Sequence, residues 1–572
     1  YVLTYNGEIY NHAAFRDELP PQPWRGHSDT ETLLACIERW GLETALQKAV
    51  GMFALALWDQ QTRCLSLARD RMGEKPLYYG FLGDRLLFGS ELKALQADPS
   101  FRAEIDRGAV ALLLRHNYIP APHSIYRGVR KLPPGTVLHI TQPRTVGEPQ
   151  PYWSLKDVVQ QGQCEPFTGS DAQATDMLEQ LLGDAISLQS VADVPLGAFL
   201  SGGVDSSAVV ALMQRRSAQP VRTFTIGFQE PEFNEAEYAM AVARHLGTEH
   251  TELYVSGRQA LDVVPKLPTL YGEPFSDSSQ IPTFLVSQMA RQHVTVSLSG
   301  DAGDELFGGY RHYDSARRLW QRIGGMPGPL RALAAGTIRS LPPRAWEAVG
   351  GTVWPLLRRG EAPQRIGDRA HKLAEMLQAP NREALYRLTL SHQPWPERVV
   401  LGAVEPDTQL TTSAAWPPQA EFEERMMFLD QVSYLPDDIL VKVDRAAMGV
   451  SLETRVPMLD HRLVEFAWRL PLNMKRRDGV NKWLLREVLY RHVPRALIDR
   501  PKRGFAVPLG EWLRGPLRDW AEALLDERRL REQGLLDPVF VRRLWTEQLA
   551  GTREWQAQLW DVLMLQAWLE VQ

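Results

Sequence analysis

Apolar residues follow two different patterns along this chain. In the first part they form short runs between turn residues, as in 52–58 and 63–68, and such runs predict β-strands. Helical periodicity is visible there at 30–40 and 108–115. Residues 1–155 are therefore predicted to form an α+β domain with mostly antiparallel strands.

From residue 172 the pattern alternates between helix and strand. Residues 156–171 are polar and glycine-containing and predict a linker. The alternation predicts a parallel sheet with helices on both faces, within a domain that spans 172–572 and is helical beyond about residue 312. The expected strands are 194–200, 221–228 and 293–299, and the expected helices are 172–189, 205–216, 235–246 and 282–291.

Composition narrows the class of protein. A chain of 572 residues is too long for one core. Its net charge of −5 argues against a nucleic-acid binder, and no apolar run reaches the about 18 residues of a membrane span. Three cysteines, Cys36, Cys64 and Cys164, indicate a reducing compartment, so a cytoplasmic protein is expected.

A glycine-rich loop follows the strand expected at 194–200. Ser201-Gly202-Gly203-Val204-Asp205 leads into an apolar helix face. The glycines allow close approach to a ligand, and the helix start suits phosphate. Asp205 would add a carboxylate for magnesium. The alternative interpretation is a plain turn between a strand and a helix.

An acidic loop of the same form follows the strand expected at 293–299. It gathers Asp301, Asp304 and Glu305 among glycines. Carboxylates this close repel one another unless a cation is held between them, which favours a magnesium or amine site. An acidic helix cap is the alternative. Further along, Lys482 opens an amphipathic helix and could balance charge on a leaving pyrophosphate.

Several motifs in one order resemble the glutamine-hydrolysing asparagine synthetase B family over nearly the whole chain. They are residues 5–11, 28–31, 69–78, 201–207, 297–310, 452–460 and 479–486. The resemblance implies a truncated α+β N-terminal-nucleophile hydrolase-like glutaminase domain, then an α/β ATP-pyrophosphatase (adenine nucleotide alpha hydrolase-like) domain with a helical C-terminal part.

In that family a first-residue cysteine attacks glutamine. By resemblance, Asn6 and Gly7 form the oxyanion hole, and Glu8 and Asp29 hold glutamine together with them. The nucleophilic cysteine is absent from this chain, because Cys36 and Cys64 fall inside a predicted helix and strand. We therefore expect an N-terminal truncation and no glutamine hydrolysis by the chain as given.

The resemblance also assigns the synthetase site. Asp205 and Asp304 are expected to hold Mg²⁺, and Asp301, Asp304 and Lys482 to be catalytic. Asp301 stands where the family commonly has glutamate, and Asp438 matches a further active-site position with a less certain alignment. The residues expected to bind ATP and pyrophosphate are Phe199, Ser201, Gly202, Gly203, Asp205, Ser206, Ile226, Ser299 and Gly300.

The implied reaction converts aspartate, ATP and glutamine or ammonia to asparagine, AMP and pyrophosphate through β-aspartyl-AMP, with ammonia moving through a tunnel. The partners are then glutamine, aspartate (or another carboxylate acceptor) and ATP, with no nucleic acid and no membrane. The resemblance leaves open whether the chain forms a homodimer. One alternative is amidation of a sugar carboxylate in surface-polysaccharide synthesis. The others are tRNA modification and a non-catalytic scaffold.

Arginines are frequent between residues 314 and 372. A tRNA-binding face and a solvated helix face are the two interpretations, and the spacing of the tryptophans there favours a core over a stacking platform. The residues concerned are Arg317, Arg318, Arg322, Arg331, Arg339, Arg344, Arg358, Arg359, Trp320, Trp346 and Trp354.

Overall fold

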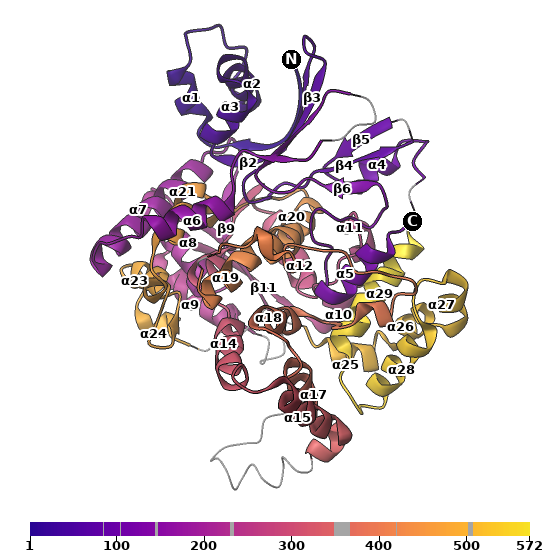
Figure 1. Ribbon diagram of the computed structural model, residues 1–572. Helices are drawn as coiled ribbons and strands as arrows, with labels where there is room; N and C mark the ends of the chain where they lie inside the picture. The colour runs from indigo at the N-terminus through magenta and orange to yellow at the C-terminus, as the bar shows by residue number, and fades with distance from the viewer. Residues whose placement is uncertain are drawn as a thin grey trace.

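The chain folds into an N-terminal pair of antiparallel sheets, a central parallel sheet and a C-terminal helical part (Figure 1). A computed structural model describes residues 1–83, 85–102, 104–142, 147–228, 234–347, 366–418, 420–500 and 507–572.

The N-terminal part contains the antiparallel strands that the sequence predicts. One sheet has the order β1-β2-β3-β7-β8, and the other has the order β5-β4-β6. The strands are β1 (Val2–Ile9), β2 (Gly51–Asp59), β3 (Cys64–Arg69), β4 (Tyr78–Leu82), β5 (Arg85–Gly89), β6 (Val129–Lys131), β7 (Thr136–Ile140) and β8 (Gln150–Pro151).

Alternation along β2 explains the layering of this part. Phe53, Leu55 and Leu57 belong to a core shared with three helices, whereas Ala54 and Ala56 belong to a core shared with the second sheet. Successive side chains of a strand point to opposite faces, so β2 can serve both cores. The result is a helix–sheet–sheet arrangement. The helices are α1 (His12–Glu18), α2 (Asp29–Trp40) and α3 (Leu42–Lys48).

The central sheet has five parallel strands in the order β11-β10-β9-β12-β13. Three of them confirm the expected strands: β9 (Leu196–Phe199), β10 (Arg222–Phe228) and β12 (Val296–Leu298). The prediction missed β11 (Glu249–Val255). The expectation of helix throughout the end of the chain is wrong at β13 (Glu453–Arg455), because this short segment gains its strand partner, β12, only in the folded chain.

Helices cover both faces of the central sheet, as predicted. Buried side chains of α8 join one core with Ala198 of β9, and those of α12 join another with Phe224 of β10. The helices expected from the sequence are confirmed as α7 (Asp171–Gln189), α8 (Val204–Arg216), α9 (Ala236–Leu246) and α12 (Gln280–Ala290).

The segment predicted as a linker begins with a helix instead. Helix α6 (Leu155–Cys164) buries Leu155, Val159 and Gly162, while its glutamines lie toward the outside. A Cβ atom on Gly162 would lie 2.6 Å from the carbonyl oxygen of Trp468. The segment is therefore packed against the C-terminal half, and its polar composition concealed a narrow apolar stripe.

The strand order creates a crevice between β9 and β12. The chain adds β10 and β11 on one side of β9, and then crosses to place β12 on the other side. In parallel sheets, ligands bind at the carboxyl ends of the strands at such a switch point. The glycine loop and the acidic loop both begin at this edge.

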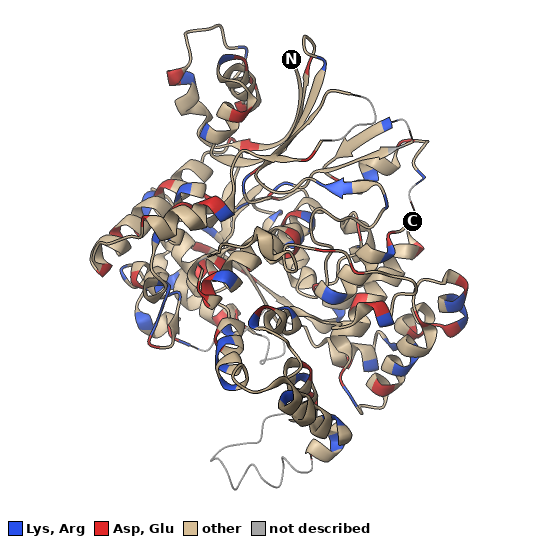
Figure 2. Ribbon diagram, viewed as in Figure 1, with Lys and Arg blue, Asp and Glu red and all other residues tan. Residues whose placement is uncertain are grey.

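Helices α14 (Arg311–Ile323), α15 (Gly328–Ser340) and α17 (Ile366–Met376) project from the body (Figure 1). Their arginines make internal contacts: Arg317 pairs with Glu423 at 2.9 Å, and Arg331 donates to the carbonyl of Ala379. These contacts fit the interpretation of a solvated helix face. Lys and Arg residues are interspersed with Asp and Glu residues along the ribbon (Figure 2). Trp354, Arg358 and Arg359 lie outside the described residues.

No helix in the described part of the chain combines the length and apolarity required to cross a membrane.

A buried ion pair joins the two halves of the chain. The Nζ atom of Lys75 lies 2.9 Å from Oδ1 of Asp444, and both side chains are 6% exposed. Asp444 also accepts from Nε of Arg445 at 2.8 Å. Burial opposes ionisation of Asp444, but Arg445 and Lys75 outweigh it and lower the pKa of Asp444 to about 2.

We expect Asp444→Asn to lower the free energy of unfolding by about 3 kcal/mol or more, because it leaves buried cations without their carboxylate. The exposed pair of Arg528 and Glu532, 2.8 Å apart, provides the control. Glu532→Gln should cost less than about 1 kcal/mol. Urea unfolding measures both, and equal losses for the two variants would contradict the assignment.

Candidate active site

The glycine loop between β9 and α8 is built for close approach. Gly202 has φ of +69°, which favours glycine. A Cβ atom there would lie 2.8 Å from the backbone nitrogen of Ala239 at the start of α9. Two independent constraints therefore exclude a side chain at Gly202.

The two serines of the loop are hydrogen-bonded to each other, and no side chain caps the first amides of α8. The hydroxyls of Ser201 and Ser206 lie 3.0 Å apart, and the amide of Ser201 donates to Oγ of Ser206 at 3.1 Å. Gly203, the N-cap residue of α8, has no side chain to cap the first amides. Such uncapped amides at a helix N-terminus suit phosphate oxygens.

The acidic loop after β12 meets the glycine loop. A Cβ atom on Gly300 would lie 2.6 Å from the amide nitrogen of Ser206, and one on Gly303 would lie 2.3 Å from Oδ1 of Asp205. The two loops therefore lie against each other at the edge of the sheet. The two backbones come together at Gly300, and Gly303 leaves room for the side chain of Asp205.

Lys482 joins the carboxylates of both loops. It lies at the N-cap of α23 (Trp483–Tyr490) with φ of +56°. Its ammonium group pairs with Asp205 and lies 2.7 Å from Oδ1 of Asp304. Burial alone would lower the pKa of Lys482, but Asp205 and Asp304 together raise it. A charged lysine therefore lies between both carboxylates.

Asp301 lies beside this centre. Ser299 donates to its Oδ2 at 2.5 Å. Burial raises the pKa of Asp301, and the hydrogen bond from Ser299 and the nearby Lys442 oppose that shift. Glu305 is buried nearby and accepts from the hydroxyl of Tyr310 at 2.5 Å.

A cavity of about 680 Å³ opens beside the two loops, which we call the nucleotide cavity. Its lining residues include Phe199, Ser201, Ser299 and Asp301. Ile226, expected near the adenosine, is 2% exposed and belongs to a core below the sheet edge. Its neighbours Phe224 and Thr225 line the cavity instead.

The sequence analysis missed an ion pair in the wall of this cavity. Lys442 lines it, and its Nζ lies 2.7 Å from Oδ2 of Asp277. Asp438, expected at the site, accepts from Asn117 at 3.0 Å. Burial and then Asp277 raise the pKa of Asp438 well above its usual value. The spacing of four residues places Asp438 and Lys442 on one helix face, but no local pattern links Lys442 to Asp277.

The residues expected to bind glutamine lie on β1 and at the start of α2. Asp29 accepts from the hydroxyl of Tyr5 at 2.8 Å and from the amide of Ile9 at 2.9 Å. Burial, followed by the charge of Asp29, raises the pKa of Glu8 to about 7. A Cβ atom on Gly7 would lie 2.1 Å from the carbonyl oxygen of Met52.

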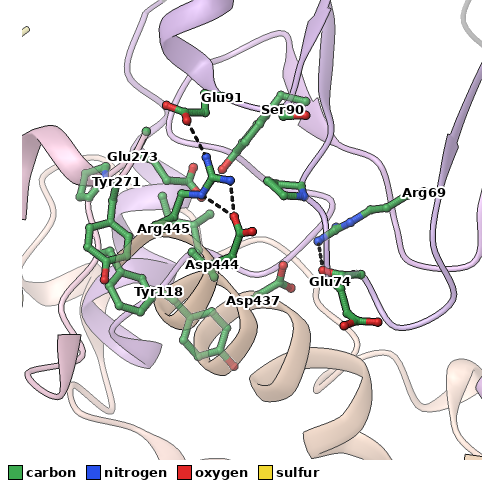
Figure 3. Close-up of a pocket in the computed structure, with 18 residues that line it drawn as sticks. Arg69, Glu74, Ser90, Glu91, Tyr118, Tyr271, Glu273, Asp437, Asp444 and Arg445 are labelled. Atoms are coloured by element: carbon green, nitrogen blue, oxygen red, sulfur yellow. Dashed lines mark hydrogen bonds and ion pairs between the residues drawn. The ribbon is translucent and has the colours of Figure 1, made fainter. Parts of the chain in front are cut away.

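Asn6 lies next to a second cavity. Its Nδ2 donates to Oγ of Ser90 at 3.0 Å. Ser90 lines a partly enclosed space, which we call the interdomain cavity (Figure 3). Residues of both halves of the chain form it, among them Glu74, Glu273 and Asp437.

The site offers oxygen ligands for Mg²⁺. Asp205 and Asp304 share one ammonium group, so their carboxylates are close together. The described residues contain no cluster of three or more His, Cys, Asp and Glu side chains that could hold a metal unaided. Mg²⁺ commonly uses one or two carboxylates together with substrate phosphates, so the donor set fits magnesium bound with a nucleotide.

Comparison with known families identifies the class of protein that this fold and site define. Residues 177–570 match the family described as "Asparagine synthase", and residues 1–153 match "Glutamine amidotransferase domain". The chain is thus a glutamine-dependent amidotransferase of the asparagine synthetase type. It belongs to the asparagine synthase family.

Curated relatives agree over nearly the whole chain. A putative glutamine-hydrolyzing asparagine synthetase of Mycobacterium tuberculosis is 35% identical over 99% of this chain and 84% of its own length. Glutamine-hydrolyzing asparagine synthetase 1 of Bacillus subtilis is 30% identical over 99% of this chain and 85% of its own length. A glutamine phosphoribosylpyrophosphate amidotransferase structure from B. subtilis reaches a TM-score of only 0.20 and carries no argument.

We expect Gly202→Ala to weaken ATP binding and to destabilise the fold. Gly247 gives a matched control, because it has φ of +70° and no atom lies within 4 Å of where its Cβ would be. Gly247→Ala should cost only the about 1–2 kcal/mol of left-handed backbone strain. Titration calorimetry with ATP and urea unfolding separate the two, and normal ATP affinity in Gly202→Ala would contradict the assignment.

Proposed function

We propose that this chain makes asparagine from aspartate by activating the side-chain carboxylate with ATP, and that the nitrogen donor is ammonia, which is released from glutamine when the first-residue cysteine of the family is present. The N-terminal part is then an N-terminal-nucleophile hydrolase-like glutaminase domain. The five-stranded parallel sheet is then an ATP-pyrophosphatase domain of the adenine nucleotide alpha hydrolase-like type.

One observation carries the proposal: Lys482 lies between Asp205 and Asp304 at the carboxyl edge of the sheet. A site that cleaves ATP at the α-phosphate has to bind the pyrophosphate that leaves. The open amides of α8, the hydroxyls of Ser201 and Ser206, and the ammonium of Lys482 are donors suited to that anion. Magnesium, when bound by Asp205 and Asp304, would neutralise phosphate charge.

In the proposed first step an oxygen of the aspartate side chain attacks the α-phosphorus and pyrophosphate leaves. Lys482 and the loop amides meet the charge that develops on the phosphate oxygens. In the second step ammonia attacks the acyl carbon, AMP leaves, and one proton of the nitrogen must be accepted. Asp301, which is buried beside the loops and has a raised pKa, is suited to accept it.

The interdomain cavity is suited to carry ammonia between the two sites. At one end it includes Ser90, which contacts Asn6 of the proposed oxyanion hole. At the other end it includes Val441, and the next residue, Lys442, lines the nucleotide cavity. Enclosure would keep ammonia from escaping to solvent.

AMP formation with ammonium as nitrogen donor tests the proposal. We expect aspartate to support it and uronic acids not to, whereas the reverse result would favour the sugar-carboxylate alternative. Lys482→Met should lower the rate by about 100-fold or more, because it removes charge stabilisation of the leaving group. Lys266→Met, at an exposed lysine of the surface, should leave the rate unchanged.

Glutamine binding should strengthen as pH rises from 6 to 8. The pKa of Glu8 is about 7 because of burial and the neighbouring Asp29, and only its ionised form attracts the α-ammonium group of glutamine. Glu8→Gln should bind more weakly and lose this dependence. Calorimetric titration with glutamine across that range measures both, and an unchanged profile in the variant would contradict the role.

A further inference from the structure

A groove on the surface lies against the outside of the interdomain cavity. It has a volume of about 1330 Å³ and is lined by parts of α4 (Leu92–Gln96), the segment before α5 (Arg107–His116), α11 (Leu267–Leu270) and the end of α29 (Gln556–Glu570). Its rim is ordered, because the hydroxyl of Tyr126 donates to Oε1 of Gln572 at 2.9 Å and accepts from Gln96 at 2.8 Å.

The groove and the interdomain cavity share one wall. Tyr271 and Gly272 line both spaces. The ring of Tyr271 stacks on Phe275 with centroids 4.6 Å apart. A Cβ atom on Gly272 would find its nearest neighbour, the amide nitrogen of Leu92, at 3.3 Å. At Tyr271 and Gly272, a wall one residue thick therefore separates the groove from the interdomain cavity.

From these shared residues we propose that the groove is a second entrance, through which ammonia from solvent reaches the synthetase site without passing the glutamine site. The inference rests on the proposed function, since it names another source of the same nitrogen. It differs from the passage beside Asn6, which begins at the proposed glutamine site.

Asp437 is placed to receive ammonia behind the wall. It is 2% exposed and lines the interdomain cavity. Its Oδ2 accepts from the amide of Ala121 at 2.8 Å, whereas its buried Oδ1 has no hydrogen-bond partner among the described residues. A buried carboxylate oxygen without a donor is costly, and an N–H of ammonia would supply one.

Three other carboxylates that line the cavity are paired with cations. Asp444 pairs with Lys75, and Glu273 pairs with Lys131. Figure 3 shows Glu91 and Asp444 both joined to Arg445. Asp437 differs from these three carboxylates, because its buried Oδ1 has no hydrogen-bond partner among the described residues.

The way from Asp437 to the nucleotide cavity is short. Asp437 and Val441 lie one helical turn apart, and Lys442 follows directly. The hydroxyl of Tyr271, a wall residue, donates to the carbonyl of Lys442 at 3.4 Å. The wall thus contacts the backbone of a residue that lines the synthetase site.

The mouth of the groove favours the uncharged form of the ligand. Lys93 and Arg102 line it, and both are exposed. Lys93 is held by the carbonyl of Thr269. These cations repel ammonium but not neutral ammonia, so neutral ammonia is the species we expect to enter.

The first test fills the groove from outside. Thr269→Trp, at an exposed lining residue, should raise the KM for ammonium several-fold in AMP formation. Ala97→Trp, exposed at the end of α4 but outside the groove lining, is the matched control and should leave KM unchanged. Aspartate-dependent exchange between ATP and pyrophosphate needs no ammonia, so it should be normal in both variants.

The second test changes the interior acceptor. Asp437→Asn keeps an oxygen for the amide of Ala121 but weakens the acceptor that faces the cavity. Its KM for ammonium should rise about tenfold, with exchange retained. At a fixed total concentration of ammonium, we compare the rate of AMP formation with the rate of ATP–pyrophosphate exchange. The ratio of the two rates should rise with pH in proportion to the concentration of neutral ammonia.

Unchanged KM for ammonium in both variants, with exchange intact, would overturn the second entrance. A rate that follows total ammonium rather than neutral ammonia would also overturn it. Failure of the proposed function has a different signature, since neither exchange nor AMP formation would then occur in the unaltered chain.

Discussion

The ammonium group of Lys482 between Asp205 and Asp304 organises the site. Burying a charged lysine costs free energy unless carboxylates compensate it, and here two carboxylates from different loops do so. These two ion pairs tie α8, the loop after β12 and α23 together at one edge of the sheet. Phosphate oxygens arriving there would find donors and acceptors already in place, so little reorganisation is required.

The topology makes this convergence unavoidable. β9 and β12 are neighbours in the parallel sheet although about a hundred residues separate them in the chain. Loops that leave the same edge of adjacent strands must meet. Gly300 lets the acidic loop approach the backbone at Ser206, and Gly303 leaves room for the side chain of Asp205, because a Cβ at each would lie within 3 Å of these atoms.

The sequence predicted the elements that carry local signals. The glycine loop, the acidic loop, the first helices of the α/β part and the antiparallel strands each follow from residue type and spacing. β13 and the π-helix η4 (Asp430–Ile439) could not be predicted, because their conformations depend on distant partners. The ion pair of Lys442 and Asp277 joins residues that lie 165 positions apart in the chain, so no local pattern signals it. The resemblance to the family predicted that Ile226 lies near the adenosine. Its sequence position could not show that its side chain points into a core instead.

The interdomain cavity persists because of the charges around it. Apolar walls alone could close together and pack more tightly, but Lys75 with Asp444 and Arg445 with Glu91 link the two halves across the space. Separating Lys75 from Asp444 would leave buried charges without their partners, which is strongly destabilising. The ion pairs that join the two halves therefore also keep open the space between their sites.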